Sequence, residues 1–190
     1  MSLFSVVLLG AALFFAYQIY LHVSRLEDPV SPTTGHHHVE EVDEDALIED
    51  ADRAYEKGEY PKAVALLHEA RAKNSNNTEV LNKLGFVLAK EQRYDEALEA
   101  YEQSLQQDAN DDTLHNAMAS VYRAQKRYDE AQKHYERALE IDAEYAITYF
   151  NYANLLVDMG ENDKARSMYA KAIELDPNFT QAKFELEKMG

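Results

Sequence analysis

The sequence predicts an all-α protein, a solenoid of antiparallel helix pairs preceded by a single N-terminal transmembrane helix. Two observations lead to this prediction: similar stretches recur every 34 residues without insertion, and an apolar run of nineteen residues lies at the start of the chain. The alanines that mark the repeat period are Ala63, Ala97, Ala131 and Ala165. A fixed period of this size is typical of repeat architectures, in which each unit packs only on its neighbours.

Residues 1–25 are predicted to form a transmembrane anchor helix. From Leu3 to Leu21 the polar side chains are Ser5, Gln18 and two tyrosine phenols. At about 1.5 Å per residue, a helix of this length reaches roughly 30 Å, enough to cross the hydrocarbon core of a bilayer. We therefore expect residues 3–23 to contact lipid. A cleaved signal peptide is the competing interpretation, but no Lys or Arg precedes the run and no clear small-x-small cleavage site follows it.

The expected side of the membrane depends on one residue, Arg25, which is the only Lys or Arg near the apolar run. Basic flanks favour the cytoplasmic side. The prediction is a single-pass protein of a bacterial inner membrane whose repeats face the cytoplasm. A periplasm-facing arrangement and a eukaryotic organelle membrane stay open as alternatives.

Residues 26–45 are predicted to form an acidic flexible linker, because two prolines, one glycine and a charge run leave too few apolar side chains to offset the cost of ordering. The adjacent residues His36–His38 could be read as a weak transition-metal site, as a chance polar run or as a sequence added for purification. Three neighbours on a flexible chain do not set a coordination geometry. The sequence therefore predicts no metal and no cofactor.

Composition limits the classes of function. The chain has no cysteine, which excludes disulfides, thiolate metal sites and a thiol nucleophile. Its formal net charge is −16, and nucleic-acid binding is disfavoured because phosphate contacts need a basic face. Phosphate-binding loops, zinc-protease motifs and nucleophile elbows are missing from the sequence. No carboxylate pairing recurs around His68, His115 or His134, so neither an enzyme nor any catalytic residue is predicted.

Each period divides into two helical patterns. In residues 78–111, Leu81, Leu84 and Leu88 share one helical face. A second helix is expected from about Asp95, with Tyr101 facing inward. Small residues at fixed places let the two helices approach closely, while large ones fill the gaps between neighbouring pairs. The predicted units are residues 44–77, 78–111, 112–145 and 146–179, followed by a short capping helix over residues 180–190.

This pattern resembles the tetratricopeptide repeat, whose unit is a 34-residue helix–turn–helix. The resemblance covers residues 44–179 and is weakest in the first unit, where Asp50 and Ala54 stand at positions for larger apolar side chains. It implies a right-handed superhelix whose concave groove holds a peptide or helix of a partner protein.

The resemblance also implies which residues line the groove. Asparagines would hold the backbone amides of an extended partner, two exposed phenylalanines would anchor apolar side chains, and Lys90 and Arg123 would meet a carboxylate. The implied groove residues are Asn82, Phe86, Lys90, Asn116, Ser120, Arg123, Phe150, Asn151 and Asn154. The Lys, Asn and Arg set with which some members clamp chaperone tails is not kept, since Phe86 and Ala117 replace two of its asparagines.

The predicted function is therefore a membrane-anchored adaptor that recruits a protein partner or assembles a membrane-associated complex. The alternative is a permanent accessory subunit of a larger membrane or envelope machine, built in through its transmembrane helix and convex face. Self-association also stays open, because the ends of a repeat stack are exposed.

Overall fold

The computed structural model describes residues 43–190, and this part of the chain is entirely helical, without strands. The predicted anchor and nearly all of the predicted linker lie outside the described residues. Among the described helices, none is long and apolar enough to span a bilayer. The helices are α2 (Glu44–Glu56), α3 (Tyr60–Lys73), α4 (Thr78–Lys90), α5 (Tyr94–Leu105), α6 (Asp112–Ala124), α7 (Tyr128–Ile141), α8 (Ala146–Asp158), α9 (Asn162–Leu175) and α10 (Thr180–Lys188).

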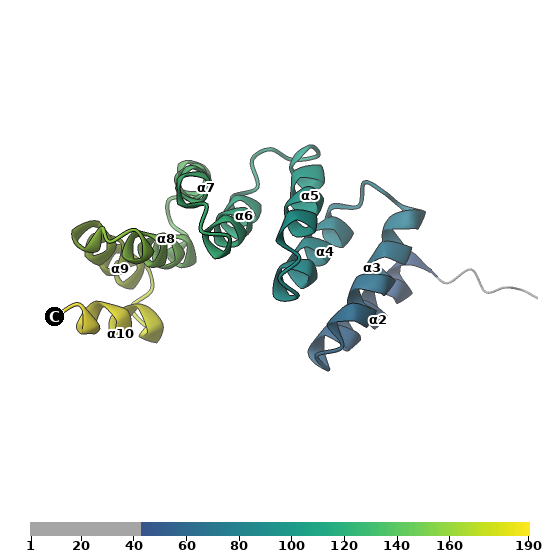
Figure 1. Ribbon diagram of the computed structural model, residues 1–190, viewed down its shortest axis with the longest axis horizontal. Coiled ribbons are helices and arrows are strands. Elements are labelled where there is room, and N and C mark those ends of the chain that lie inside the picture. Colours follow the sequence, from purple (N-terminus) through teal and green to yellow (C-terminus); the bar gives the residue numbers. More distant parts are fainter. Residues whose placement is uncertain (1–42) are drawn as a thin grey trace, which may run out of the picture. The chain divides into compact units, whose positions relative to one another are not determined.

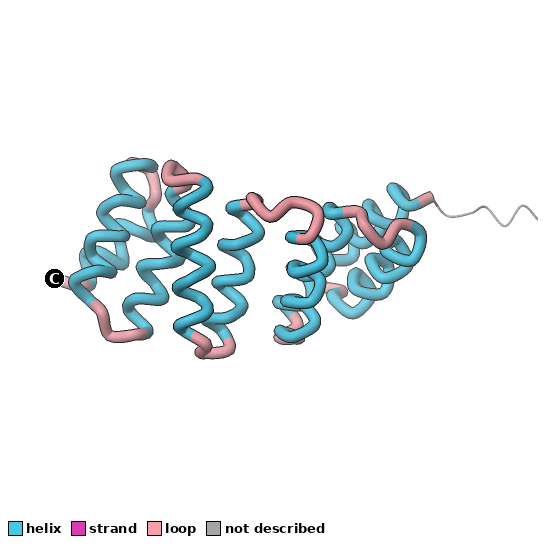
Figure 2. Tube along the Cα trace, turned by 90° about the horizontal axis from the view of Figure 1, so that it is seen from above, coloured by secondary structure: helices cyan, strands magenta, loops and turns pink. Residues whose placement is uncertain are grey.

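The helices pack as successive hairpins. The main contacts join α2 to α3, α4 to α5, α6 to α7 and α8 to α9, and α10 packs on α9. Figure 1 shows these pairs following one another in chain order, and Figure 2 shows the short loops that join them. The first helix of each pair begins 34 residues after the previous one. The prediction of an all-helical, solenoid-like fold is confirmed.

All four hairpins use the same kind of turn. A residue with positive φ stands between the two helices, at Gly58, Gln92, Lys126 and Gly160, with φ between 61° and 78°. After α4, the Gln92 amide donates to the carbonyl of Ala89 and the Arg93 amide to the carbonyl of Leu88. These two bonds form a Schellman motif, which satisfies carbonyls that the ending helix leaves free.

Small residues let the paired helices approach. Ala97, Ala131 and Ala165, near the start of each second helix, are fully buried. Gly85 makes a still closer approach: a Cβ atom there would lie 2.5 Å from Cε1 of Tyr101. The ring of Tyr101 is therefore seated directly on the backbone of α4.

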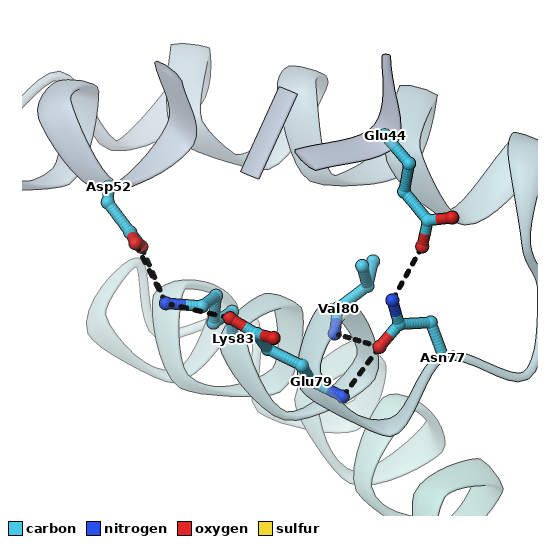
Figure 3. Close-up of polar contacts among 6 residues, drawn as sticks. All are labelled: Glu44, Asp52, Asn77, Glu79, Val80 and Lys83. Atoms are coloured by element: carbon cyan, nitrogen blue, oxygen red, sulfur yellow. Dashed lines mark hydrogen bonds and ion pairs between the residues drawn. The ribbon is translucent and has the colours of Figure 1, made fainter. Parts of the chain in front are cut away.

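Polar contacts join the first helix of neighbouring pairs (Figure 3). Asn77 accepts hydrogen bonds from the amides of Glu79 and Val80 and so caps α4, while its Nδ2 donates to Glu44 of α2 at 2.6 Å. Further along α4, Nζ of Lys83 lies 2.9 Å from a carboxylate oxygen of Asp52 on α2. These contacts fix α4 beside α2 and leave the opposite side of α4 to face α6.

Candidate functional site

A pocket of about 360 Å³ lies between α4 and α6, with α5 behind it. We call it the groove pocket. Four of the nine predicted groove residues line it, namely Phe86, Lys90, Asn116 and Ser120. The remaining lining residues are Ala89, Tyr94, Tyr101, Ala117, Val121 and Ala124. Its lining is thus mainly apolar, and Lys90, Asn116 and Ser120 among the predicted groove residues add polar groups.

Phe86 forms the edge of the groove pocket. Its side chain is 44% exposed, and its ring lies 5.3 Å from that of Tyr55 on α2. It also lines a smaller pocket of about 200 Å³ on the α2 side. Nζ of Lys90, one turn further along α4, lies 5.1 Å from the centre of the Phe86 ring, a cation–π distance. Phe86 therefore presents an apolar surface to both pockets.

Tyr101 is a groove-pocket residue that sequence reasoning treated only as packing. Its side chain is 3% exposed. Burial raises the pKa of its phenol far above the usual range, so the hydroxyl keeps its proton. Within the described part of the chain this hydroxyl has no hydrogen-bond partner, although the equivalent tyrosines do. Tyr135 shares a hydrogen bond with Ser120 at 3.0 Å, and Tyr169 donates to Asn154 at 2.6 Å.

The repeat period explains this difference. Ser120 and Asn154 stand 34 residues apart, and 34 residues before Ser120 the chain has Phe86. A phenylalanine side chain can neither donate to nor accept from a phenol. Comparing the three positions would have revealed the unpartnered Tyr101 from sequence alone.

The remaining predicted groove residues contact one another or their neighbours. Asn151 donates to Asn116 at 3.2 Å across α8 and α6. The ring of Phe150 lies 4.9 Å from that of Phe179 and 5.8 Å from that of Tyr169. Phe150 is therefore packed and half-buried, not freely exposed as expected, because the segment before α10 covers it. Asn82 is also half-buried, and its Oδ1 is enclosed without a hydrogen-bond partner among the described residues.

One predicted groove cation, and a lysine on the α2 side of α4, are already neutralised. Nε of Arg123 lies 2.6 Å from a carboxylate oxygen of Asp158 on α8, and Lys83 pairs with Asp52 on α2. Arg123 is thus engaged within the fold, whereas the sequence interpretation left it free for a partner. Lys90 forms no ion pair with any residue of the described part. The groove pocket therefore has one unpaired positive charge at its edge.

A histidine pair was not foreseen. His115 of α6 and His134 of α7 place their Nδ1 atoms 3.0 Å apart, so one nitrogen donates to the other. Burial, and next the charge of His115, lowers the pKa of His134 to about 4. Burial also lowers the pKa of His115. Both rings are neutral at pH 7. In residues 43–190 no cluster of three or more His, Cys, Asp or Glu side chains could hold a metal ion.

Comparison with known proteins agrees with this architecture. Among solved structures, the chain is similar to MamA, with 24% identity, a TM-score of 0.65, and coverage of 73% of this chain and 81% of that one. It is also similar to YrrB, described as a TPR protein with an unusual peptide-binding site, with 21% identity, a TM-score of 0.66, and coverage of 76% and 74%. These two likenesses concern the fold alone.

A third similar structure is the first TPR domain of Spaghetti (RPAP3) bound to the HSP90 peptide SRMEEVD. Here the identity is 26%, the TM-score is 0.57, and the match covers 61% of this chain and 92% of that one. No curated protein sequence matches the chain. Two family models of the tetratricopeptide repeat match it, one over residues 54–121 and the other over residues 109–178. Residues 54–178 therefore consist of tetratricopeptide repeats.

Proposed function

We propose that the protein is a membrane-anchored adaptor that binds a segment of a partner protein in the concave groove of a right-handed superhelix, along α4, α6 and α8. The observation that carries this proposal is the groove pocket, which is lined mainly by apolar groups and has the exposed ring of Phe86 at its edge. An exposed phenylalanine beside such a pocket is typical of a surface that a partner covers.

Two further observations support the proposal. Tetratricopeptide repeat proteins mediate protein–protein interactions, and two of the similar structures are described with a peptide-binding site or a bound peptide. In addition, the side chains of the groove pocket offer amide, hydroxyl and ammonium groups that can bond to the main chain of an extended segment. The partner is then recruited to, or assembled at, the membrane that holds residues 1–25.

The groove can be tested against a closely matched surface. Phe86→Ala/Lys90→Ala removes the exposed ring and its lysine. The control is Phe184→Ala/Lys188→Ala on α10, where a 57% exposed phenylalanine lies 4.3 Å below the lysine four residues later. Full-length variants are expressed in the native cell, and co-purifying proteins are quantified by mass spectrometry.

We expect the groove variant to lose a defined set of partners that the control retains, with both variants keeping a helical circular dichroism spectrum. Equal recovery of every partner by the groove variant would contradict the groove assignment. It would favour the alternative of an accessory subunit held through its convex face or its N-terminal segment.

The membrane placement is proposed from the apolar run and Arg25, with the repeats in the cytoplasm of a bacterial cell. Since the chain has no cysteine, Ser31→Cys supplies a single reporter beside the proposed anchor. A membrane-impermeant maleimide should label this residue only after the cells are permeabilised. Labelling of intact cells would instead place the repeats outside the cytoplasm.

A further inference from the structure

The groove pocket differs from the corresponding places in the next two repeats at two adjacent positions, which both affect a tyrosine that all three units share. Gly85 stands where the later units have Ala119 and Ala153, and Phe86 stands where they have a hydrogen-bonding side chain. As a result, Tyr101 is seated against the α4 backbone and its hydroxyl has no partner within the described residues. A phenol that is 97% buried and lacks a partner carries an energetic cost, unless a ligand or water completes its hydrogen bond.

The hydroxyl of Tyr101 is not enclosed, although the residue as a whole is buried. Tyr101 lines the groove pocket, and its oxygen is not among the enclosed polar atoms that lack partners in the described part. In the following unit the corresponding hydroxyl is occupied by Ser120. The second unit therefore presents to a ligand a polar group that its neighbours use internally.

The walls of the pocket select against charge. Ala89, Ala117, Val121 and Ala124 supply methyl groups, and Phe86 supplies a ring face. At about 360 Å³ the volume is near the lower limit of ligand pockets, which span roughly 300–1,000 Å³. It suits a side chain and not a folded element. Lys90, which forms no ion pair within residues 43–190, repels Lys and Arg from the pocket edge.

From these features we infer that the groove pocket is a specificity subsite that takes one large apolar side chain of an extended partner segment, with a carbonyl beside that side chain accepting a hydrogen bond from Tyr101. This inference rests on the proposed binding of a protein segment in the groove and adds the chemistry that the pocket selects. Tyr101 is then a binding residue, and Phe86 and Lys90 border the subsite.

The test uses the full-length chain in detergent micelles and a phage-displayed library of random twelve-residue peptides. Selected peptides are synthesised, and their dissociation constants are measured by fluorescence anisotropy. We expect the selected peptides to share one large apolar position and few Lys or Arg residues beside it. Replacing that apolar residue by Ala should weaken binding about tenfold or more.

Two protein variants probe the subsite. Tyr101→Phe removes only the hydroxyl and should weaken binding about threefold to tenfold. Ala124→Leu adds volume at an exposed lining position and should weaken it at least tenfold. The control is Tyr135→Phe, whose hydroxyl is occupied by Ser120, and it should leave the affinity unchanged.

The outcomes separate the subsite from the groove. If Phe86→Ala/Lys90→Ala abolishes binding of the selected peptides but Tyr101→Phe and Ala124→Leu do not weaken it, the subsite is refuted and the groove stands. A set of selected peptides without a shared apolar position would also refute the subsite. If Phe86→Ala/Lys90→Ala leaves binding of every selected peptide unchanged, both the groove and the subsite are refuted.

Discussion

Replacing Gly85 by Ala tests the seating of Tyr101 on α4. In an exposed helix this change stabilises by about 1 kcal/mol, because Ala has the higher helix propensity. Here the added Cβ would lie 2.5 Å from Cε1 and 2.8 Å from Cζ of Tyr101. Ordinary carbon–carbon contacts are about 3.5–4.0 Å, so the ring must move by about 1 Å. It is buried and packed, and it cannot yield freely.

The two effects on stability oppose each other. Overpacking a core costs about 1–3 kcal/mol, and the gain in propensity offsets about 1 kcal/mol of it. We expect Gly85→Ala to lower the free energy of unfolding by up to about 2 kcal/mol, measured by urea unfolding followed by circular dichroism. Ala119→Gly, at the same position one unit later, should also destabilise by about 1 kcal/mol or more, through the loss of helix propensity and of a fully buried methyl group.

A double variant sharpens the result. Gly85→Ala/Phe86→Ser copies the Ala119–Ser120 pair, which accompanies a tyrosine that is hydrogen-bonded. Its destabilisation should be smaller than the sum of the two single effects by about 1 kcal/mol, the value of one hydrogen bond. An increase in stability for Gly85→Ala alone would refute the reasoning, since it would mean that no ring rests on Gly85.

Three further predictions concern stability. Gln92→Gly should raise the free energy of unfolding in urea by about 1 kcal/mol, because a residue with a side chain is strained at the φ of 62° that Gln92 adopts. Gly58→Gln should lower it by a similar amount, because Gly58 also has a positive φ. The pKa of histidine is about 6.5 in the unfolded chain, and the pKa of His134 is about 4 in the folded protein. Because the unfolded chain takes up the proton first, the free energy of unfolding has its full value above pH 6.5 and falls as the pH drops towards 4. Because His134 is half-exposed, we expect the free energy of unfolding to fall by about 1–2 kcal/mol over this range. The fall should be absent in His134→Asn, and an equal fall in that variant would assign the effect to other groups. Arg123→Ala should cost less than about 1 kcal/mol, because its pair with Asp158 is one-third exposed, and a double-mutant cycle measures the coupling.

The helices were predictable because the chain repeats its apolar spacing without insertion. A period of 34 residues determines where each hairpin begins, and inward positions such as Tyr135 and Ala131 are fully buried as expected. The strained turns were also predictable in principle: Gly58 and Gly160 stand at the same place in the period as Gln92, which points to a positive φ there.

Contacts between helices were harder to predict. The pairing of His115 with His134 depends on how α6 and α7 are rotated about their axes. The apolar stripe of a helix in the sequence defines this rotation only to within about one residue. Phe150 was misjudged as exposed because its cover, Phe179, comes from the segment beyond the last complete hairpin. Spacing within one unit carries no information on either contact.

The groove positions of the repeats are not equivalent, and this has a consequence for recognition. Asn116 and Asn151 bond to each other, and Arg123 is held by a carboxylate. A partner would have to displace these contacts, and each displacement cancels much of the bond gained. At the groove pocket, Tyr101 and Lys90 need no such exchange, because within the described residues the Tyr101 hydroxyl has no hydrogen-bond partner and Lys90 forms no ion pair. Binding energy should therefore concentrate between α4 and α6, and substitutions there should outweigh those along α8.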